Sequence, residues 1–129
     1  MTEFRIGEAA SLLGVSPDTV RRWIDAGRLS AGRDEHGHRV IPGKDLAAFA
    51  RSQVDTETGW GLSSARNRFR GIVTDVVKDT VMAQVEIAAG PFRVVSLMSR
   101  QACDELGLEP GVVAVAVVKS TNVVVELAG

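Results

Sequence analysis

The stretch Ser63-Ser64-Ala65-Arg66-Asn67-Arg68-Phe69-Arg70 begins the half of the chain that decides its fold, and a second polar cluster, Val117-Val118-Lys119-Ser120-Thr121, lies near its end. Both clusters combine a cation with hydroxyl groups, and the run between them is apolar and rich in β-branched residues. Their polar side chains are almost all hydrogen-bond donors at neutral pH. Such a set of donors suits an oxyanion better than a metal cation or a proton-transfer substrate.

Short β-branched runs follow the first cluster with the length and spacing of strands. The expected strands cover residues 68–77, 81–88, 91–98, 112–118 and 122–127. A short helix is expected from Ser99 to Leu106. Five short strands with one intervening helix predict a small OB-like β-barrel.

The apolar spacing before residue 52 is helical instead. A first helix is expected over residues 7–13, followed by a turn at Gly14-Val15. The run Ser16-Pro17-Asp18 then predicts the start of a second helix, because Ser is a good N-cap, Pro is favoured at the first helical position and an acid suits the first turn. Residues 32–42 predict a hairpin with a polar tip, and residues 44–50 predict a third helix.

This change of period predicts an α+β chain with two domains. The first covers residues 1–52 and the second residues 63–129. Residues 53–62 contain turn formers and acids without a sustained period, so we interpret them as a linker. The length of 129 residues fits two small domains.

Composition excludes several classes of protein. The net charge of −1 is not that of a strongly basic nucleic-acid binder, so any DNA contact must come from local clusters. Cys103 is the single cysteine, which excludes an intrachain disulfide and favours a small packing residue. His36 and His38 are too few ligands for a metal site, and we find no catalytic set, so neither an enzyme nor a cofactor is expected. The chain has no signal peptide pattern and no apolar run long enough for a bilayer, which predicts a cytoplasmic protein without a membrane partner.

The first half resembles the MerR-type or excisionase-type winged helix-turn-helix. The resemblance rests on Ile6-Gly7-Glu8-Ala9-Ala10, Leu13-Gly14-Val15-Ser16, Thr19-Val20-Arg21-Arg22-Trp23, Gly27-Arg28-Leu29 and Arg39-Val40-Ile41-Pro42. It implies that the second helix meets the major groove and that the hairpin forms a wing against phosphates or the minor groove of double-stranded DNA. The expected DNA-binding residues are Ser16, Thr19, Arg21, Arg22, Arg33, His38 and Arg39. An Arg pair on a helix can equally be a solvated face; the ordered set of capped helix, Arg pair and basic hairpin favours DNA.

The second half resembles the Mop domain, the molybdate-binding member of the TOBE class. The resemblance rests on Ser64-Ala65-Arg66-Asn67, Gly71, Met98-Ser99, Leu106-Gly107-Leu108, Gly111 and Val118-Lys119-Ser120. It implies a homo-oligomer, a dimer or a hexamer built as a trimer of dimers, that shares strands and binds molybdate or tungstate at subunit interfaces. The oxyanion site that it implies comprises Ser64, Ala65, Arg66, Asn67, Ser99, Lys119 and Ser120. Of these, Ser64 and Arg66 are expected from one chain, and Ser99, Lys119 and Ser120 from the other side of the pocket. Ala102 departs from the pattern, because some relatives have a hydroxyl residue there.

Three hypotheses follow from these two halves. The first is a transcriptional regulator that binds DNA in response to molybdate or tungstate. The second is a cytoplasmic protein for molybdate storage or delivery whose first half does not regulate transcription. The third is an architectural DNA binder, similar to an excisionase, with a structural barrel.

Overall fold

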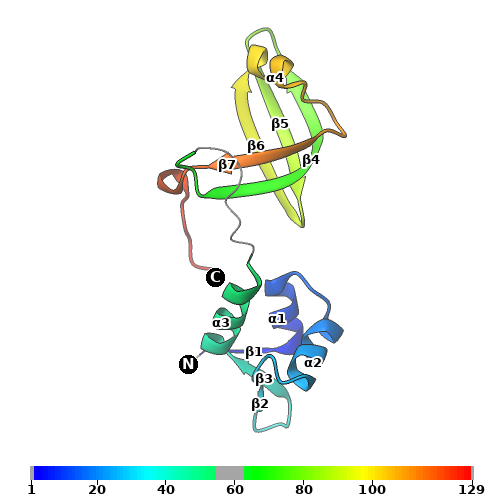
Figure 1. Cartoon of the computed structure of the whole chain (residues 1–129), viewed down its shortest axis with the longest axis vertical. Helices are drawn as coiled ribbons and strands as arrows, with labels where there is room; N and C mark the ends of the chain where they lie inside the picture. Colours follow the sequence, from blue (N-terminus) through cyan, green and yellow to red (C-terminus); the bar gives the residue numbers. More distant parts are fainter. Residues whose placement is uncertain (1, 55–62, 129) are drawn as a thin grey trace. The chain divides into compact units, whose positions relative to one another are not determined.

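The computed structural model describes residues 2–54 and 63–128. The chain divides into two compact units, Met1–Gly59 and Trp60–Gly129 (Figure 1). Residues 55–62, which make up most of the predicted linker, lie outside the described residues. None of the helices within the described ranges is both long and apolar enough to cross a membrane.

The first unit contains three helices and a small antiparallel sheet. The helices are α1 (Ile6–Leu13), α2 (Pro17–Asp25) and α3 (Gly43–Gln53). The sheet has the order β1-β3-β2, with β1 at Glu3–Arg5, β2 at Gly32–Arg33 and β3 at Arg39–Pro42. The three predicted helices are confirmed, and β1 is an additional strand that the sequence did not indicate.

Local chemistry explains where α1 and α2 meet. Gly14 ends α1 with φ of 69°, a left-handed conformation that costs glycine little. Ser16 then caps α2 by accepting the N–H of Thr19, and Pro17 occupies the first helical position. The helices close on a core whose buried side chains are Ala9, Ala10, Val20, Leu29, Ile41, Leu46 and Phe49. This unit therefore buries the apolar faces of all three helices within one chain.

The second unit is built on a four-stranded antiparallel sheet. Its strands are β4 (Asn67–Lys78), β5 (Met82–Ala89), β6 (Phe92–Ser99) and β7 (Val113–Val118), in the order β6-β5-β4-β7. Helix α4 (Arg100–Leu106) follows β6, and a 3₁₀ turn, η1 (Ser120–Asn122), follows β7. Buried Cys103 packs with Val73, Ala83, Val85 and Ile87, so the interpretation of this cysteine as a packing residue is confirmed.

The fifth predicted strand is wrong for this single chain. Residues 122–127 were expected to form a strand, but the structure has η1 followed by an extended segment without strand pairing. Val124, Val125 and Leu127 are 86%, 86% and 98% exposed. A strand needs a neighbour for its backbone hydrogen bonds, and within the described residues this segment has none. The sheet consequently ends at β6 on one side and at β7 on the other, and the predicted closed five-stranded barrel is not confirmed.

Candidate DNA-binding and anion-binding sites

Helix α2 has one buried face and one exposed face. Val20 is fully buried, and the ring of Trp23 lies 4.8 Å from that of Phe49, between ring centres. These contacts fix the rotation of α2 against the core. Arg21 and Arg22 are consequently exposed, as the sequence predicts, but they lie in the middle and last turn of α2 rather than at its start.

The polar side chains of α2 make hydrogen bonds with one another. The Ser16 hydroxyl lies 2.8 Å from that of Thr19. Arg22 Nη2 donates to Thr19 Oγ1 at 3.3 Å, and Arg21 Nη1 pairs with Asp18 Oδ1 at 2.6 Å. Ser16 is therefore first of all a helix cap, while the two arginines project from the same turn with exposed, local partners.

The β2–β3 hairpin carries the other three predicted DNA-binding residues. Arg33 Nη1 donates to the Gly37 carbonyl at 2.7 Å, and Arg39 Nη1 pairs with Asp25 Oδ1 at 3.1 Å. Asp34 shapes the hairpin tip by accepting the N–H groups of His36 and His38, both at 2.9 Å. The His38 N–H is the largest cause that lowers the pKa of Asp34 below its ordinary value, so this carboxylate stays charged at neutral pH.

The two polar clusters of the second unit lie next to each other. Asn67 pairs with Val118 in the β4–β7 ladder, and its Nδ2 donates to the Val118 carbonyl at 3.1 Å. This pairing brings the Ser64–Asn67 stretch beside Lys119 and Ser120. Arg66 and Lys119 are exposed, and neither forms an ion pair among the described residues. Two cations at one end of the sheet, with no ion-pair partner in the part of the chain that the structure describes, are well placed for an anion.

Ser99 lies at the other end of the same sheet. It pairs with Met82, beyond the end of β4 at Lys78, whereas Asn67 begins β4. The length of β4 separates the two ends by on the order of 30 Å, and Figure 1 shows α4 and η1 far apart within the second unit. The Ser99 hydroxyl caps α4 by accepting the N–H of Ala102 at 3.1 Å. One chain therefore brings Ser64, Ala65, Arg66, Asn67, Lys119 and Ser120 together and leaves Ser99 out.

Two residues of this region were not among the predicted site residues. The Ser63 hydroxyl accepts the Ala65 N–H at 3.1 Å, and the Ser63 carbonyl accepts Arg66 Nη1 at 3.1 Å, so Ser63 shapes the turn that presents Arg66. The Nε of Arg68 is buried and has no hydrogen-bond partner among residues 2–54 and 63–128. The alternation of Arg66, Arg68 and Arg70 along the strand is the sequence signal that could have drawn attention to Arg68.

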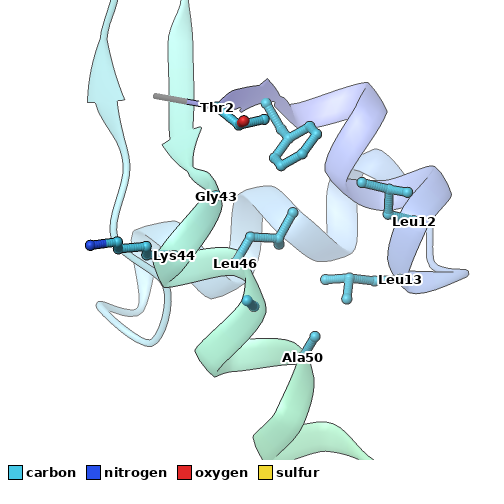
Figure 2. Close-up of a pocket in the computed structure, with 9 residues that line it drawn as sticks. Thr2, Leu12, Leu13, Gly43, Lys44, Leu46 and Ala50 are labelled. Atoms are coloured by element: carbon cyan, nitrogen blue, oxygen red, sulfur yellow. The ribbon is translucent and has the colours of Figure 1, made fainter. Parts of the chain in front are cut away.

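An apolar pocket of about 710 Å³ lies in the first unit, between α1 and α3. Figure 2 shows Leu13, Leu46 and Ala50 facing a common space, while the Lys44 amine points away from it. The sequence did not indicate this pocket. Among the described residues, no group of three or more His, Cys, Asp or Glu side chains is arranged to hold a metal ion.

Comparison with known proteins assigns both halves. A helix-turn-helix domain model matches residues 3–54, and a TOBE domain model matches residues 63–125. Molybdenum-pterin-binding protein 2 of Clostridium pasteurianum is 42% identical over 63 residues, which make up 48% of this chain and 93% of that protein. This chain belongs to the TOBE family. It carries a helix-turn-helix domain ahead of its TOBE domain, as the two resemblances in the sequence predict.

Two longer proteins match smaller parts of their own length. Molybdenum-pterin-binding protein MopB of Rhodobacter capsulatus is 29% identical over 93 residues, covering 69% of this chain and 34% of MopB. Type II methyltransferase M.Eco47II of Escherichia coli is 39% identical over 59 residues, covering 45% of this chain and 14% of the methyltransferase. The TOBE protein described here thus spans about a third or less of the length of these two relatives.

A solved structure supports the fold of the TOBE domain. The molybdate-binding protein from Sporomusa ovata superposes with a TM-score of 0.50 at 30% sequence identity, covering 52% of this chain and all of that chain. The four-stranded sheet with its single helix is therefore an arrangement found in a molybdate-binding relative.

Proposed function

We propose that this protein is a DNA-binding transcriptional regulator that responds to molybdate or tungstate and catalyses no reaction. One observation carries the proposal. A helix-turn-helix domain with two exposed arginines on α2 is joined in one chain to a TOBE domain in which Arg66 and Lys119 both adjoin the Asn67–Val118 pair at one end of the sheet. In this proposal the first domain binds DNA and the second domain binds the anion.

The first unit is suited to duplex DNA. We propose that α2 enters the major groove with Thr19, Arg21 and Arg22, and that the β2–β3 hairpin acts as a wing with Arg33, His38 and Arg39. The two arginines of α2 are exposed and held by weak local partners, so they can exchange these for base edges or phosphates at small cost. Ser16 contributes by fixing the start of α2.

The second unit is suited to a small tetrahedral dianion. Such an ion is costly to desolvate, so a site must offset its charge and fill its acceptor positions. We propose that Arg66 and Lys119 supply the charge, while the hydroxyls of Ser64 and Ser120, the Asn67 side chain and the backbone N–H of Ala65 supply donors. A pocket made of donors rejects sulfate and phosphate by its size and geometry. Ala102 brings no hydroxyl to this set.

We infer that the anion site is completed by a second copy of the chain. Ser99 cannot reach Lys119 within one chain, because the two lie at opposite ends of the sheet. A cavity of about 460 Å³, lined by β5, β6 and β7, is also open in the single chain. The exposed tail, in which Val123, Val125 and Leu127 share one side, has the apolar pattern of a strand that fills such a space in another protomer. Burying Val125 and Leu127 would contribute about 1.5–3 kcal/mol each.

Regulation then follows from a shared site. An anion that binds between copies stabilises one assembly over others, and the assembly sets how many DNA-binding units meet adjacent half-sites. The coupling typical of such systems is about 1–3 kcal/mol, which corresponds to a change in DNA affinity of about 5- to 150-fold. The anion itself stays a ligand and takes part in no reaction.

Two titrations test this proposal. Calorimetry of the full chain with molybdate, tungstate and sulfate is expected to give heat with the first two and little with sulfate. Anisotropy of a labelled duplex is then expected to show a changed DNA affinity when molybdate saturates the protein. Saturation with no change in DNA affinity would exclude a sensor.

A second candidate is molybdate storage or delivery. The Clostridium relative favours this candidate. The 63 matched residues make up 93% of that protein, so it is little longer than a TOBE domain, and it is named a molybdenum-pterin-binding protein. This candidate predicts high anion stoichiometry in an oligomer together with no DNA affinity at low salt.

A further inference from the structure

A basic pocket of about 410 Å³ lies between the beginning of α1 and the β2–β3 hairpin. Its walls include Arg5, Gly7, Arg33, His38 and Arg39, and no carboxylate lines it. Arg5 was not among the predicted DNA-binding residues. It ends β1 and immediately precedes α1, so it comes from a different part of the sequence than the hairpin residues.

The arginines that line this pocket outnumber the carboxylates that form ion pairs with them. Arg39 is paired with Asp25 at 3.1 Å. Arg5 Nη2 and His38 Nδ1 both approach one oxygen of Asp34, at 3.8 Å and 3.7 Å, and Asp34 already accepts two backbone N–H groups. Arg33 donates to the Gly37 carbonyl and forms no ion pair with any residue that the structure describes. One carboxylate thus serves several donors, and the Arg33 charge has no counter-ion in this part of the chain.

The sheet register adds a repulsion that an anion would relieve. Arg33 lies directly opposite Arg39 in the β2–β3 ladder. Like charges at directly opposite positions of an antiparallel pair are destabilising. Arg39 turns to Asp25 and Arg33 to the Gly37 carbonyl, which leaves space between the two strands and α1.

Helix α1 contributes to the same pocket. Ile6 and Gly7, its first two residues, line the pocket. N–H groups in the first turn of a helix have no acceptor within that helix, and the helix dipole makes this end attractive to anions. The nearest acid of α1 is Glu8, whose Oε1 accepts the Arg5 N–H at 3.1 Å and which does not line the pocket. Cationic side chains and the first residues of α1 therefore line the same pocket.

We propose that this pocket binds a phosphodiester group of the DNA backbone, with Arg5 as a phosphate ligand supplied from outside the recognition helix and the hairpin. The inference rests on the proposed DNA-binding function and deepens it. It assigns α1 and Arg5 to the DNA interface, and it predicts that this contact anchors the unit on any DNA sequence, since a phosphate carries no base information.

The test compares full-length variants on a labelled duplex of random sequence. Anisotropy titrations are run over a series of salt concentrations for wild type, Arg5→Gln, Arg5→Lys and Arg51→Gln. Arg51 is an exposed arginine of α3 that does not line the pocket, so its variant matches the change in net charge. Thermal unfolding of each variant shows whether the unit remains folded.

Loss of one phosphate contact has a distinctive signature. Arg5→Gln is expected to weaken binding by about 3- to 10-fold at low salt and to reduce the slope of log affinity against log salt by about one. Arg5→Lys should keep most of the slope, and Arg51→Gln should stay within about 2-fold of wild type. A double variant, Arg5→Gln with Arg33→Gln, should lose less than the product of the two single losses, because both side chains hold the same phosphate.

Two results would overturn the inference and leave the proposed function standing. In one, Arg22→Ala weakens binding while Arg5→Gln behaves like Arg51→Gln. In the other, the Arg5 and Arg33 losses multiply without coupling. If wild type bound no duplex even at low salt, the proposed function and the phosphate site would both be wrong.

Discussion

The two units of this chain differ in how much of their apolar surface a single copy can bury. In the first unit, Leu12 and Val54 are the large apolar side chains that remain exposed among residues 2–54. In the second, exposed apolar residues occur on every strand and throughout the tail, including Leu97 at 69%, Val113 at 56% and Leu127 at 98%. We propose that part of this exposed apolar surface is an interaction site. The first unit thus buries most of its large apolar side chains, whereas the second leaves many of them exposed.

This difference in buried apolar surface is matched by a difference in where the proposed binding residues of each unit lie. The proposed DNA-binding residues of the first unit stand on a core that one chain completes, so each copy can present them alone. The residues that we propose for anion binding in the second unit are divided between two ends of an open sheet. A ligand site that one copy cannot complete can report on assembly, which is the property that a regulator needs.

The largest expected effect comes from removing the apolar side of the tail. Val125→Asp combined with Leu127→Asp places charges where we propose that a second protomer buries the tail, so the assembly should dissociate and molybdate binding should be lost. Size-exclusion chromatography with light scattering measures the mass. Val124→Asp is the matched control, because Val124 lies on the other side of the extended segment together with Glu126. A wild-type protein that runs as a monomer, or a double variant of unchanged mass, would contradict the comparison.

Next in size is the loss of one cation from the anion site. Lys119→Ala is expected to weaken molybdate binding by about 1.5–3 kcal/mol, roughly 10- to 150-fold, as is typical of a lost charged hydrogen bond. Calorimetry measures the affinity. Lys44→Ala removes the same charge from the first unit and should leave molybdate affinity unchanged. Equal effects of the two variants would show that only net charge matters and that the residue assignment is wrong.

A glycine in β4 tests the packing of the second unit directly. A Cβ on Gly71 would collide with the Ala88 carbonyl on the neighbouring strand, so Gly71→Ala should lower the free energy of unfolding by about 1–3 kcal/mol. Gly32→Ala, in the first unit, places its Cβ in open space and serves as control. Urea unfolding followed by circular dichroism measures both. An unchanged urea midpoint for Gly71→Ala would mean that β4 and β5 separate more easily than their register indicates.

The sequence predicted the elements whose signals are local. The capped start of α2, the helical period of α1 and the β-branched runs of β4 to β7 each depend on neighbours within a few residues, and all were placed within a few residues of their bounds. Strand β1 was missed because three residues are too few to show a period. The strand expected over residues 122–127 was wrong for a different reason. Its residues favour a strand, but pairing depends on a neighbour that one chain does not offer.

The residues of the candidate sites were also predictable where local sequence patterns mark them, but their spatial arrangement was not. The resemblance to the Mop pattern placed Ser64 and Arg66 on one chain and Ser99, Lys119 and Ser120 on the other side of the pocket. In the single chain, Arg66 and Lys119 instead flank the same Asn67–Val118 pair. The separation of Ser99 from this pair depends on strand order, which spacing along the chain does not reveal. Arg5 was overlooked because an isolated arginine ahead of a helix has no pattern; its place in a pocket arises from the pairing of β1 with β3.

A smaller effect separates the two roles of Ser16. Its hydroxyl caps α2, so Ser16→Ala should destabilise the first unit by about 1 kcal/mol. Ser16→Asp keeps an acceptor at the cap but adds a negative charge near the DNA. Thermal unfolding should therefore show a loss for Ala alone, whereas DNA binding should weaken more for Asp. If both variants bound DNA as wild type does, the start of α2 would not lie near the phosphates.

The smallest expected effect concerns the turn between β4 and β5. Asp79 Oδ1 accepts the N–H groups of Met82 at 2.7 Å and Val81 at 2.8 Å. The Met82 N–H, followed by that of Val81, lowers the pKa of this carboxyl below its ordinary value. Since the folded pKa is the lower one, the stabilising contribution is fully present above the unfolded pKa of about 3.9 and is lost as the pH falls through the folded value.

Asp79→Asn keeps an oxygen acceptor and removes the charge. The gap in unfolding midpoint between wild type and this variant should therefore be widest near neutral pH and close as the solution is acidified below about pH 4. Asp75→Asn is the control for charge, because the Asp75 carboxylate accepts no hydrogen bond from the described residues. Scans of midpoint against pH for the three proteins measure the effect. If the difference in unfolding midpoint widened in acid instead, the Asp79 carboxylate would not stabilise the turn through its charge. The turn would then depend on the backbone hydrogen bond from the Asp79 N–H to the Met82 carbonyl.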